Sequence, residues 1–211
     1  MASAPGASLS SAAASAMPES GFRALESLFE SRGVVPVSVF DPEYPDALKA
    51  LPRHPFLLYV RGTLPEAPSL SVVGSRKPTP YGLSVTSAFV SDFVRNGFAV
   101  VSGGAFGIDV AAHRAAIDSG GVTLAFVGTG IDLDYPRQHG RLFEEIVAKG
   151  GAVVSPFPPG ALPLRQHFPI RNALVAAFSL GTLVVEAAEG SGSLITARNA
   201  LEFGKEVFAV P

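Results

Sequence analysis

The sequence predicts a doubly wound α/β fold built on a mostly parallel sheet. From Leu70 onward, short apolar runs alternate with stretches that have the composition and length of helices. The runs are continuous in Val, Ile, Leu, Phe and Ala, which is typical of strands buried on both faces of a parallel sheet. Glycine-rich loops follow four of these runs. Because such folds bind ligands beyond the carboxyl ends of their strands, we expect one ligand-binding edge.

The elements follow one another regularly along the chain. The expected strands cover residues 70–74, 98–102, 122–127, 151–155, 182–186 and 206–210. The expected helices cover residues 81–95, 107–118, 138–149, 171–179 and 193–203. The stretch 155–169 holds five prolines and is too long for a plain connection, so we expect a functional loop or a partner surface there.

Two smaller parts precede the alternating region. Residues 1–20 are rich in Ala and Ser but lack the basic start and apolar block of a secretory signal, so we expect a disordered lead-in. Residues 21–63 hold a short amphipathic helix at 22–31 and two strand-like pieces between prolines, which predicts an appendage packed on the main domain of residues 64–211. The chain stops at Pro211 directly after an apolar strand, so we expect a shortened form of a longer protein.

Composition limits the classes of function. The 16 Lys and Arg against 18 Asp and Glu give a net charge of −2, so any site for a polyanion has to be local. The chain has no cysteine and no run as long as a membrane span. We expect a cytoplasmic protein with no cofactor, metal or membrane partner. The cations that lie in or beside the loops are Arg76, Lys77, Arg137, Arg165, His167, Arg171, Arg198 and Lys205.

The glycine-rich loops are suited to phosphates. Glycines let backbone N–H groups approach a ligand, helix N-termini add partial positive charge, and hydroxyls donate hydrogen bonds. The candidate residues are Gly74, Ser75, Arg76 and Lys77 in the first loop, Ser102, Gly103, Gly104 and Gly107 in the second, and Ser191, Gly192, Ser193 and Thr196 in the fourth. The third loop, residues 128–136, carries two carboxylates, so we expect it to contact sugar hydroxyls or to shape the wall. Its Tyr135 is either core or a stacking surface.

Phe168, Arg171 and Asn172 complete the candidate set. A cation at a helix start opposes the helix dipole, so Arg171 is expected to have a partner such as a phosphate or Glu186. Phe168 offers its ring to a base or is buried. For Asp109 we favour a helix cap or first-turn acid over a site role, and we expect it to hold His113, four residues on, by packing or hydrogen bonding.

Several enzyme classes lack their motifs. A dinucleotide site needs G-x-G-x-x-G after the first strand, where this chain has Arg76, Lys77 and Pro78 instead. The sequence contains no Walker-type phosphate loop and no G-x-S-x-G nucleophile. We therefore expect no catalytic set and no enzyme.

Taken in order, the motifs resemble one family. They include V-G-S-R at 73–76, S-G-G-A-F-G-I-D at 102–109, F-P-I-R-N at 168–172 and S-G-S-L-I-T-A at 191–197. Together with matching residues from about position 39 onward, they are similar to the DprA/Smf family, the DNA-processing protein A of natural transformation. Two departures stand out, since the family usually has Arg where Ala173 lies and Glu where Pro156 lies.

The resemblance implies an extended Rossmann domain that binds single-stranded DNA in a positively charged pocket. It also implies protection of the strand, a homodimer and help in loading the RecA recombinase. By position, Arg76 matches an arginine that holds backbone phosphate, and the loop 102–107 matches a phosphate-contacting loop. Arg171 and the turn 191–196 complete the pocket.

An enzyme of related architecture is the alternative. The chain resembles the phosphoribohydrolases of the lysine-decarboxylase-like (LOG) group in keeping Gly181, Thr182 and a later Glu186. It lacks the Pro-Gly-Gly that precedes them in that group. Two assays discriminate these functions. Binding of labelled oligo-dT supports a strand-binding protein, whereas hydrolysis of AMP supports the enzyme.

Overall fold

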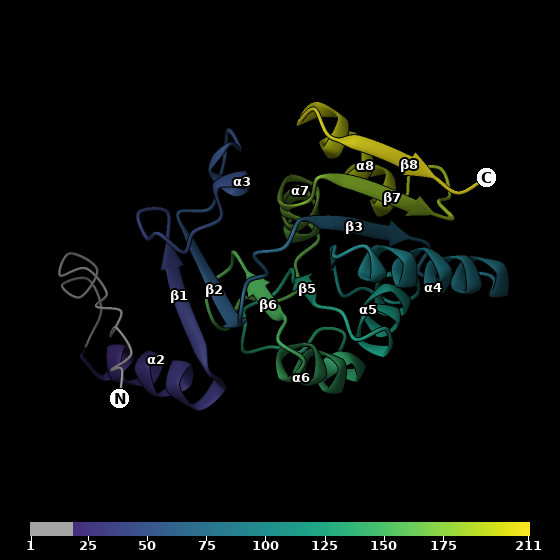
Figure 1. Ribbon diagram of the computed structural model, residues 1–211. Helices are drawn as coiled ribbons and strands as arrows, with labels where there is room; N and C mark the ends of the chain where they lie inside the picture. Colours follow the sequence, from purple (N-terminus) through teal and green to yellow (C-terminus); the bar gives the residue numbers. More distant parts are fainter. Residues whose placement is uncertain (1–18) are drawn as a thin grey trace.

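A computed structural model of the protein describes residues 19–211 (Figure 1). The predicted lead-in therefore lies almost wholly outside the described residues. The strands are β1 (Val34–Ser38), β2 (Leu57–Gly62), β3 (Ser69–Gly74), β4 (Ala99–Ser102), β5 (Thr123–Phe126), β6 (Ala152–Ser155), β7 (Gly181–Val185) and β8 (Glu206–Ala209). The helices are α2 (Glu19–Arg32), α3 (Asp46–Lys49), α4 (Pro80–Arg95), α5 (Ile108–Asp118), α6 (Gly140–Ala148), α7 (His167–Phe178) and α8 (Gly192–Glu202), with a 3₁₀ turn at Arg137–His139.

The eight strands within residues 19–211 form one mostly parallel sheet, as the sequence predicted. Their spatial order is β1-β2-β6-β5-β4-β3-β7-β8, and the six strands from β6 to β8 are parallel to one another. After β3 the chain adds β4, β5 and β6 on one side and then returns to add β7 and β8 on the other. The strand order therefore reverses between β3 and β7, which is where doubly wound folds leave a crevice for ligands.

The segment before β3 extends the sheet instead of packing on it. β2 pairs antiparallel with β6, placing Tyr59 opposite Ser155, and β1 pairs antiparallel with β2. The expected strand-like pieces are thus confirmed as strands, but they form one edge of the main sheet. The division of the chain near residue 63 into two parts stays a prediction.

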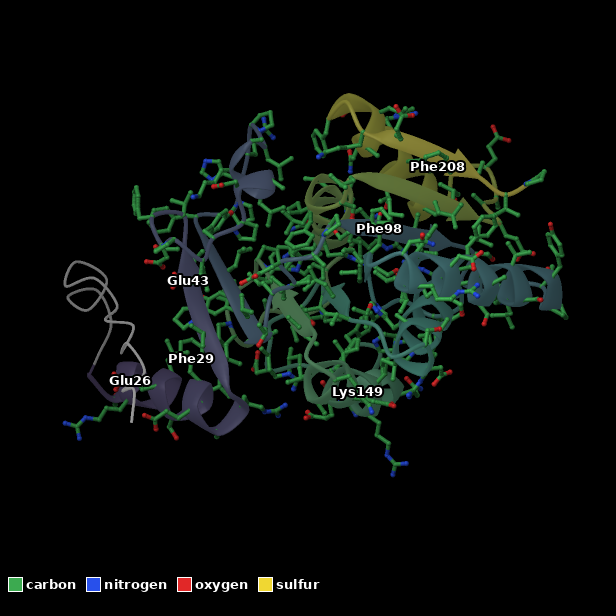
Figure 2. All side chains as sticks on the ribbon, viewed as in Figure 1. Glu26, Phe29, Glu43, Phe98, Lys149 and Phe208 are labelled. Carbon is green, nitrogen blue, oxygen red and sulfur yellow. The ribbon has the colours of Figure 1, made fainter. Side chains whose placement is uncertain are left out.

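Helices cover both faces of the sheet (Figures 1 and 2). Neighbouring strand residues point to opposite faces: Val101 and Leu124 pack against α7, while Val100 and Ala125 belong to the clusters covered by α4, α5 and α6. This double burial explains the continuous apolar strands. Among residues 19–211, no helix is long and apolar enough to cross a membrane.

Candidate functional site

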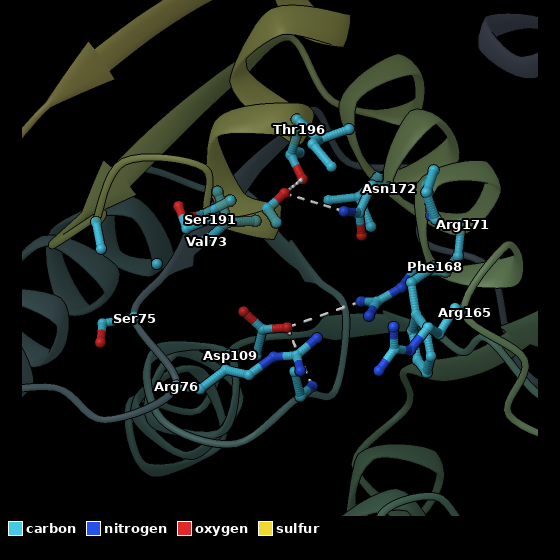
Figure 3. Close-up of a pocket in the computed structure, with 18 of the residues that line it drawn as sticks. Val73, Ser75, Arg76, Asp109, Arg165, Phe168, Arg171, Asn172, Ser191 and Thr196 are labelled. Carbon is cyan, nitrogen blue, oxygen red and sulfur yellow. Dashed lines mark hydrogen bonds and ion pairs between the residues drawn. The ribbon is translucent and has the colours of Figure 1, made fainter.

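A cleft of about 870 Å³ opens beyond the carboxyl ends of β3 and β7, at the reversal of strand order (Figure 3). Its wall combines the loop after β3, the start of α7 and the start of α8. Most of the residues that line the cleft were predicted from the sequence to share one site. The predicted residues that line the cleft are Gly74, Ser75, Arg76, Lys77, Phe168, Arg171, Asn172, Ser191, Gly192, Ser193 and Thr196.

Cations outnumber carboxylates on this wall. Among the described residues that line the cleft, the cations are Arg76, Lys77, Arg165 and Arg171, and the carboxylate is that of Asp109. Arg76, Lys77 and Arg165 are exposed, whereas Arg171 is buried. The chain as a whole is slightly acidic, so the cleft is the local positive site that the net charge required.

The loop after β3 is held close to β7 by its backbone. A Cβ on Gly74 would overlap the carbonyl oxygen of Val185, so only glycine fits at this approach. The N–H of Ser75 donates to the same carbonyl at 3.2 Å, and the carbonyl of Ser75 accepts from the N–H of Ile108 at 3.0 Å. These contacts present Arg76 to the cleft from a fixed backbone.

Two guanidinium groups lie near the Phe168 ring. Those of Arg76 and Arg171 are each 6.0 Å from the ring centre, and the Tyr135 ring is 6.0 Å away, centre to centre. Figure 3 shows Arg76 reaching in from one side and Phe168 with Arg165 standing on the other. Phe168 is half-buried, so part of its surface stays open to the cleft. An aromatic face beside an exposed cation such as Arg76 can stack a base while the cation holds a phosphate.

The partner of Arg171 within the protein is Asp109. The expectation that Glu186 could be this partner was wrong. Helix α7 begins at His167, four residues earlier than predicted, because a proline is tolerated in the first turn of a helix. Arg171 therefore lies in the second turn, and its Nη1 is 3.7 Å from Oδ2 of Asp109. Burial raises the pKa of the Asp109 carboxyl, and the nearby Arg171 charge opposes that rise.

Asp109 is a first-turn acid of α5, as expected, but the expected hydrogen bond between Asp109 and His113 is not formed. Oδ2 of Asp109 accepts from the N–H of Ala105 at 3.0 Å. Nδ1 of His113 instead shares a hydrogen bond of 2.7 Å with Oγ1 of Thr123. Burial lowers the pKa of His113 to about 3, so this imidazole is neutral and serves the core.

The first turn of α8 closes the cleft opposite Asp109. The Ser191 and Ser193 hydroxyls are 2.8 Å apart, and Ser191, the N-cap, makes no side-chain bond to the first-turn amides. Nδ2 of Asn172 donates to the carbonyl of Gly192 at 3.0 Å and ties α7 to α8. Helix N–H groups and hydroxyls directed at a hollow can hold an anion.

The second and third glycine loops lie beside the cleft. Gly103, Gly104 and Gly128 line a small adjoining hollow that shares Arg76, Phe168 and Arg171 with the cleft. Gly107, with φ of 81°, packs against the backbone of the first loop. The four loops thus form one edge, but the first and fourth provide the larger hollow.

The position of Ser102 does not suit the predicted role of this residue in binding a phosphate. It is fully buried, and its hydroxyl donates to the carbonyl of Val72 at 2.6 Å. The hydroxyl therefore joins β4 to β3 and is not directed at a ligand. Ala173, the departure from the family pattern, does not line the cleft either.

Arg165 and Tyr135 also line the cleft. Arg165 was among the cations expected beside the loops, but neither residue was in the predicted set of DNA-binding residues. Arg165 lies in the proline-rich connection before α7, which supports the expectation of a functional loop at 155–169. In the sequence, the position of Arg165 three residues before Phe168 was the signal that could have placed it in the site. Tyr135, left open between core and stacking surface, is 44% exposed and faces Phe168.

The family model described as DNA recombination-mediator protein A matches residues 36–211. The chain belongs to this family. The match covers every strand from β2 to β8 and all residues of the cleft. The resemblance to DprA/Smf proteins inferred from the motifs is therefore confirmed.

Relatives of the family share much of the sequence. The chain is 45% identical to Protein Smf of Escherichia coli over 170 residues, covering 80% of this chain and 46% of that protein. It is 42% identical to Protein Smf of Synechocystis, covering 81% of this chain and 44% of that protein. The chain thus spans about half the length of these relatives.

Two solved structures of DprA proteins share the fold. DNA processing protein A from Streptococcus pneumoniae has a TM-score of 0.79 at 38% identity, covering 88% of this chain and 66% of that one. The protein from Helicobacter pylori, described for its single-stranded DNA binding mode, has a TM-score of 0.76 at 30% identity, covering 84% and 80%. The Rossmann-like architecture is therefore shared with the family.

Proposed function

We propose that the cleft binds single-stranded DNA. The observation that carries the proposal is the Phe168 ring, which is open to the cleft and has the guanidinium groups of Arg76 and Arg171 each 6.0 Å from its centre. Single strands are held by a cationic groove that follows the backbone and by aromatic faces that stack bases, without reading sequence. The Helicobacter pylori relative described for its single-stranded DNA binding mode supports the same ligand.

The strand backbone has a defined set of partners in this proposal. Arg76, Lys77 and Arg165 supply exposed charge, and the first turn of α8 supplies N–H groups and hydroxyls. The charge of Arg171 is offset by Asp109, so three cations remain for phosphates. The slope of log affinity against log salt is then roughly −2, from about −0.7 per phosphate neutralised.

The family membership suggests a biological setting for this binding. We propose that the protein protects incoming single strands in the cytoplasm during natural transformation, helps to load RecA, and acts as a homodimer without catalysis. The family membership of residues 36–211 and the similarity to DprA proteins support these points. A RecA-dependent strand-exchange assay, run with and without the protein, tests the loading step.

The binding proposal is tested by fluorescence polarisation with labelled oligo-dT. Duplex DNA of equal length and AMP serve as competing ligands, and each titration is repeated at several salt concentrations. We expect salt-sensitive binding of the strand, weaker binding of duplex, and loss of most affinity in Arg76→Ala.

Arg95→Ala is the matched control, since this arginine lies at the far end of α4 in an exposed pair with Asp92 and does not line the cleft. It removes the same charge and is expected to leave affinity unchanged. Equal losses in both variants would contradict a specific role for the cleft, and AMP hydrolysis without strand binding would favour the phosphoribohydrolase alternative.

A further inference from the structure

Glu186 has a backbone conformation that its residue type disfavours. Its φ is 53°, and within residues 19–211 it is the only residue other than glycine with a positive φ. Glycine would adopt this conformation without strain. A glutamate here therefore needs a reason that lies in its side chain.

The side chain holds the start of α4. Oε2 of Glu186 accepts from the N–H of Thr79 at 2.8 Å, and Oε1 accepts from the Thr79 hydroxyl. Thr79 is the N-cap of α4, and its Oγ1 accepts from the N–H of Gly82 at 3.1 Å. A Cβ on Gly82 would overlap the Glu186 carboxylate. The carboxylate thus takes the position of an anion at this helix N-terminus.

Both ends of the arginine-bearing loop are tied to one short piece of backbone. At one end, Ser75 is bonded to the carbonyl of Val185, and at the other, Thr79 is bonded to the side chain of the next residue, Glu186. Three residues lie between these ties, at positions 76–78, and they include both cations of the loop. Few conformations connect two anchors over so short a loop.

We propose that Glu186 is a positioning residue that fixes Arg76 over the cleft. The inference rests on the proposed binding of single-stranded DNA. This role explains both the strained backbone at position 186 and the hydrogen bonds to Thr79. Through them, the residue that follows β7 sets the direction of Arg76.

Charge alone predicts the opposite result for a substitution at this position. A carboxylate near a DNA site repels phosphates, so removing it tightens binding if electrostatics is its only effect. Glu189 lies three residues on in the same connection, is exposed, and does not line the cleft. Glu189→Gln therefore measures the effect of losing one nearby negative charge without losing the bonds to Thr79.

The experiment measures oligo-dT affinity in Glu186→Gln and Glu189→Gln, each in the wild-type and the Arg76→Ala background. We expect Glu186→Gln to weaken binding roughly five- to tenfold, which corresponds to the net contribution of one ordinary hydrogen bond. Glu189→Gln is expected to leave binding equal or slightly tighter. In the Arg76→Ala background, Glu186→Gln is expected to cause no further loss, because Glu186 acts through Arg76.

Glu186→Gly separates positioning from folding. Glycine relieves the positive φ and removes the carboxylate, so we expect a folded protein with an unchanged or raised melting temperature, the same loss of affinity, and faster amide hydrogen exchange at residues 75–82. Unchanged affinity in Glu186→Gln, or an equal loss in the Arg76→Ala background, would overturn the inference. A wild-type protein without strand affinity would instead overturn the proposed function.

Discussion

Arg171 and Asp109 face each other beneath the cleft, with Nη1 and Oδ2 at 3.7 Å and both side chains more than nine-tenths buried. Nε of Arg171 has no hydrogen-bond partner within the described residues. The pair places a compensated cation in the floor of the cleft, while the uncompensated cations lie at its rim. The floor therefore supports the site, and the rim supplies the charge for phosphates.

Removal of Asp109 is expected to destabilise the protein strongly. Asp109→Asn leaves the buried Arg171 guanidinium without its counter-charge, and breaking a buried pair in this way typically costs about 3–5 kcal/mol. The free energy of unfolding from urea denaturation measures the loss. Asp92→Asn breaks the exposed pair with Arg95 and is expected to cost less than about 1 kcal/mol. Equal effects of the two substitutions would show that the buried pair has no special role.

The salt dependence of strand binding is expected to report the rim cations one at a time. Lys77→Ala and Arg165→Ala each remove one exposed charge from the cleft. Each is expected to reduce the magnitude of the log–log salt slope by roughly 0.7. Polarisation titrations at four or more salt concentrations give the slopes. If Arg95→Ala changes the slope as much, the phosphates do not lie at this rim.

Phe168 is expected to contribute by stacking. Phe168→Leu keeps an apolar side chain but removes the aromatic face, and loss of one base stack typically costs about 1–3 kcal/mol of binding. Oligo-dT affinity and the melting temperature are measured together. Phe89→Leu, on the exposed face of α4, is the control and is expected to leave affinity unchanged. Unaltered affinity in Phe168→Leu would show that this ring does not stack a base.

The contribution of Glu186 to stability is expected to depend on pH. Hydrogen bonds from Thr79 lower the pKa of Glu186 below its ordinary value of 4.5. A lowered carboxyl pKa contributes stability that is fully present above 4.5 and is lost as the pH falls through the folded value. The difference in melting temperature between the wild type and Glu186→Gln is therefore expected to shrink below pH 4.5. A constant difference across this window would contradict the assignment.

Much of this architecture could be predicted from the sequence because its signals are local. Continuous apolar runs predicted the strands of the parallel sheet, and the glycines after them marked its carboxyl edge. The partner of Arg171 could not be predicted, since Asp109 is distant in sequence and meets it only after the strands take their order. The structural place of Ser102 depended on the neighbouring strand in the same way. The start of α7 was misplaced because prolines favoured a loop.

Photo-crosslinking tests the central claim most directly. An oligo-dT strand carrying 5-iodouracil is bound to the wild-type protein, and the complex is irradiated. The modified peptides are then identified by mass spectrometry. We expect crosslinks at Phe168 or Tyr135, the aromatic rings of the cleft, and their loss in Arg76→Ala. Crosslinks confined to aromatic residues outside the cleft, such as Phe40 and Phe56 at the β1–β2 edge, would contradict strand binding in the cleft.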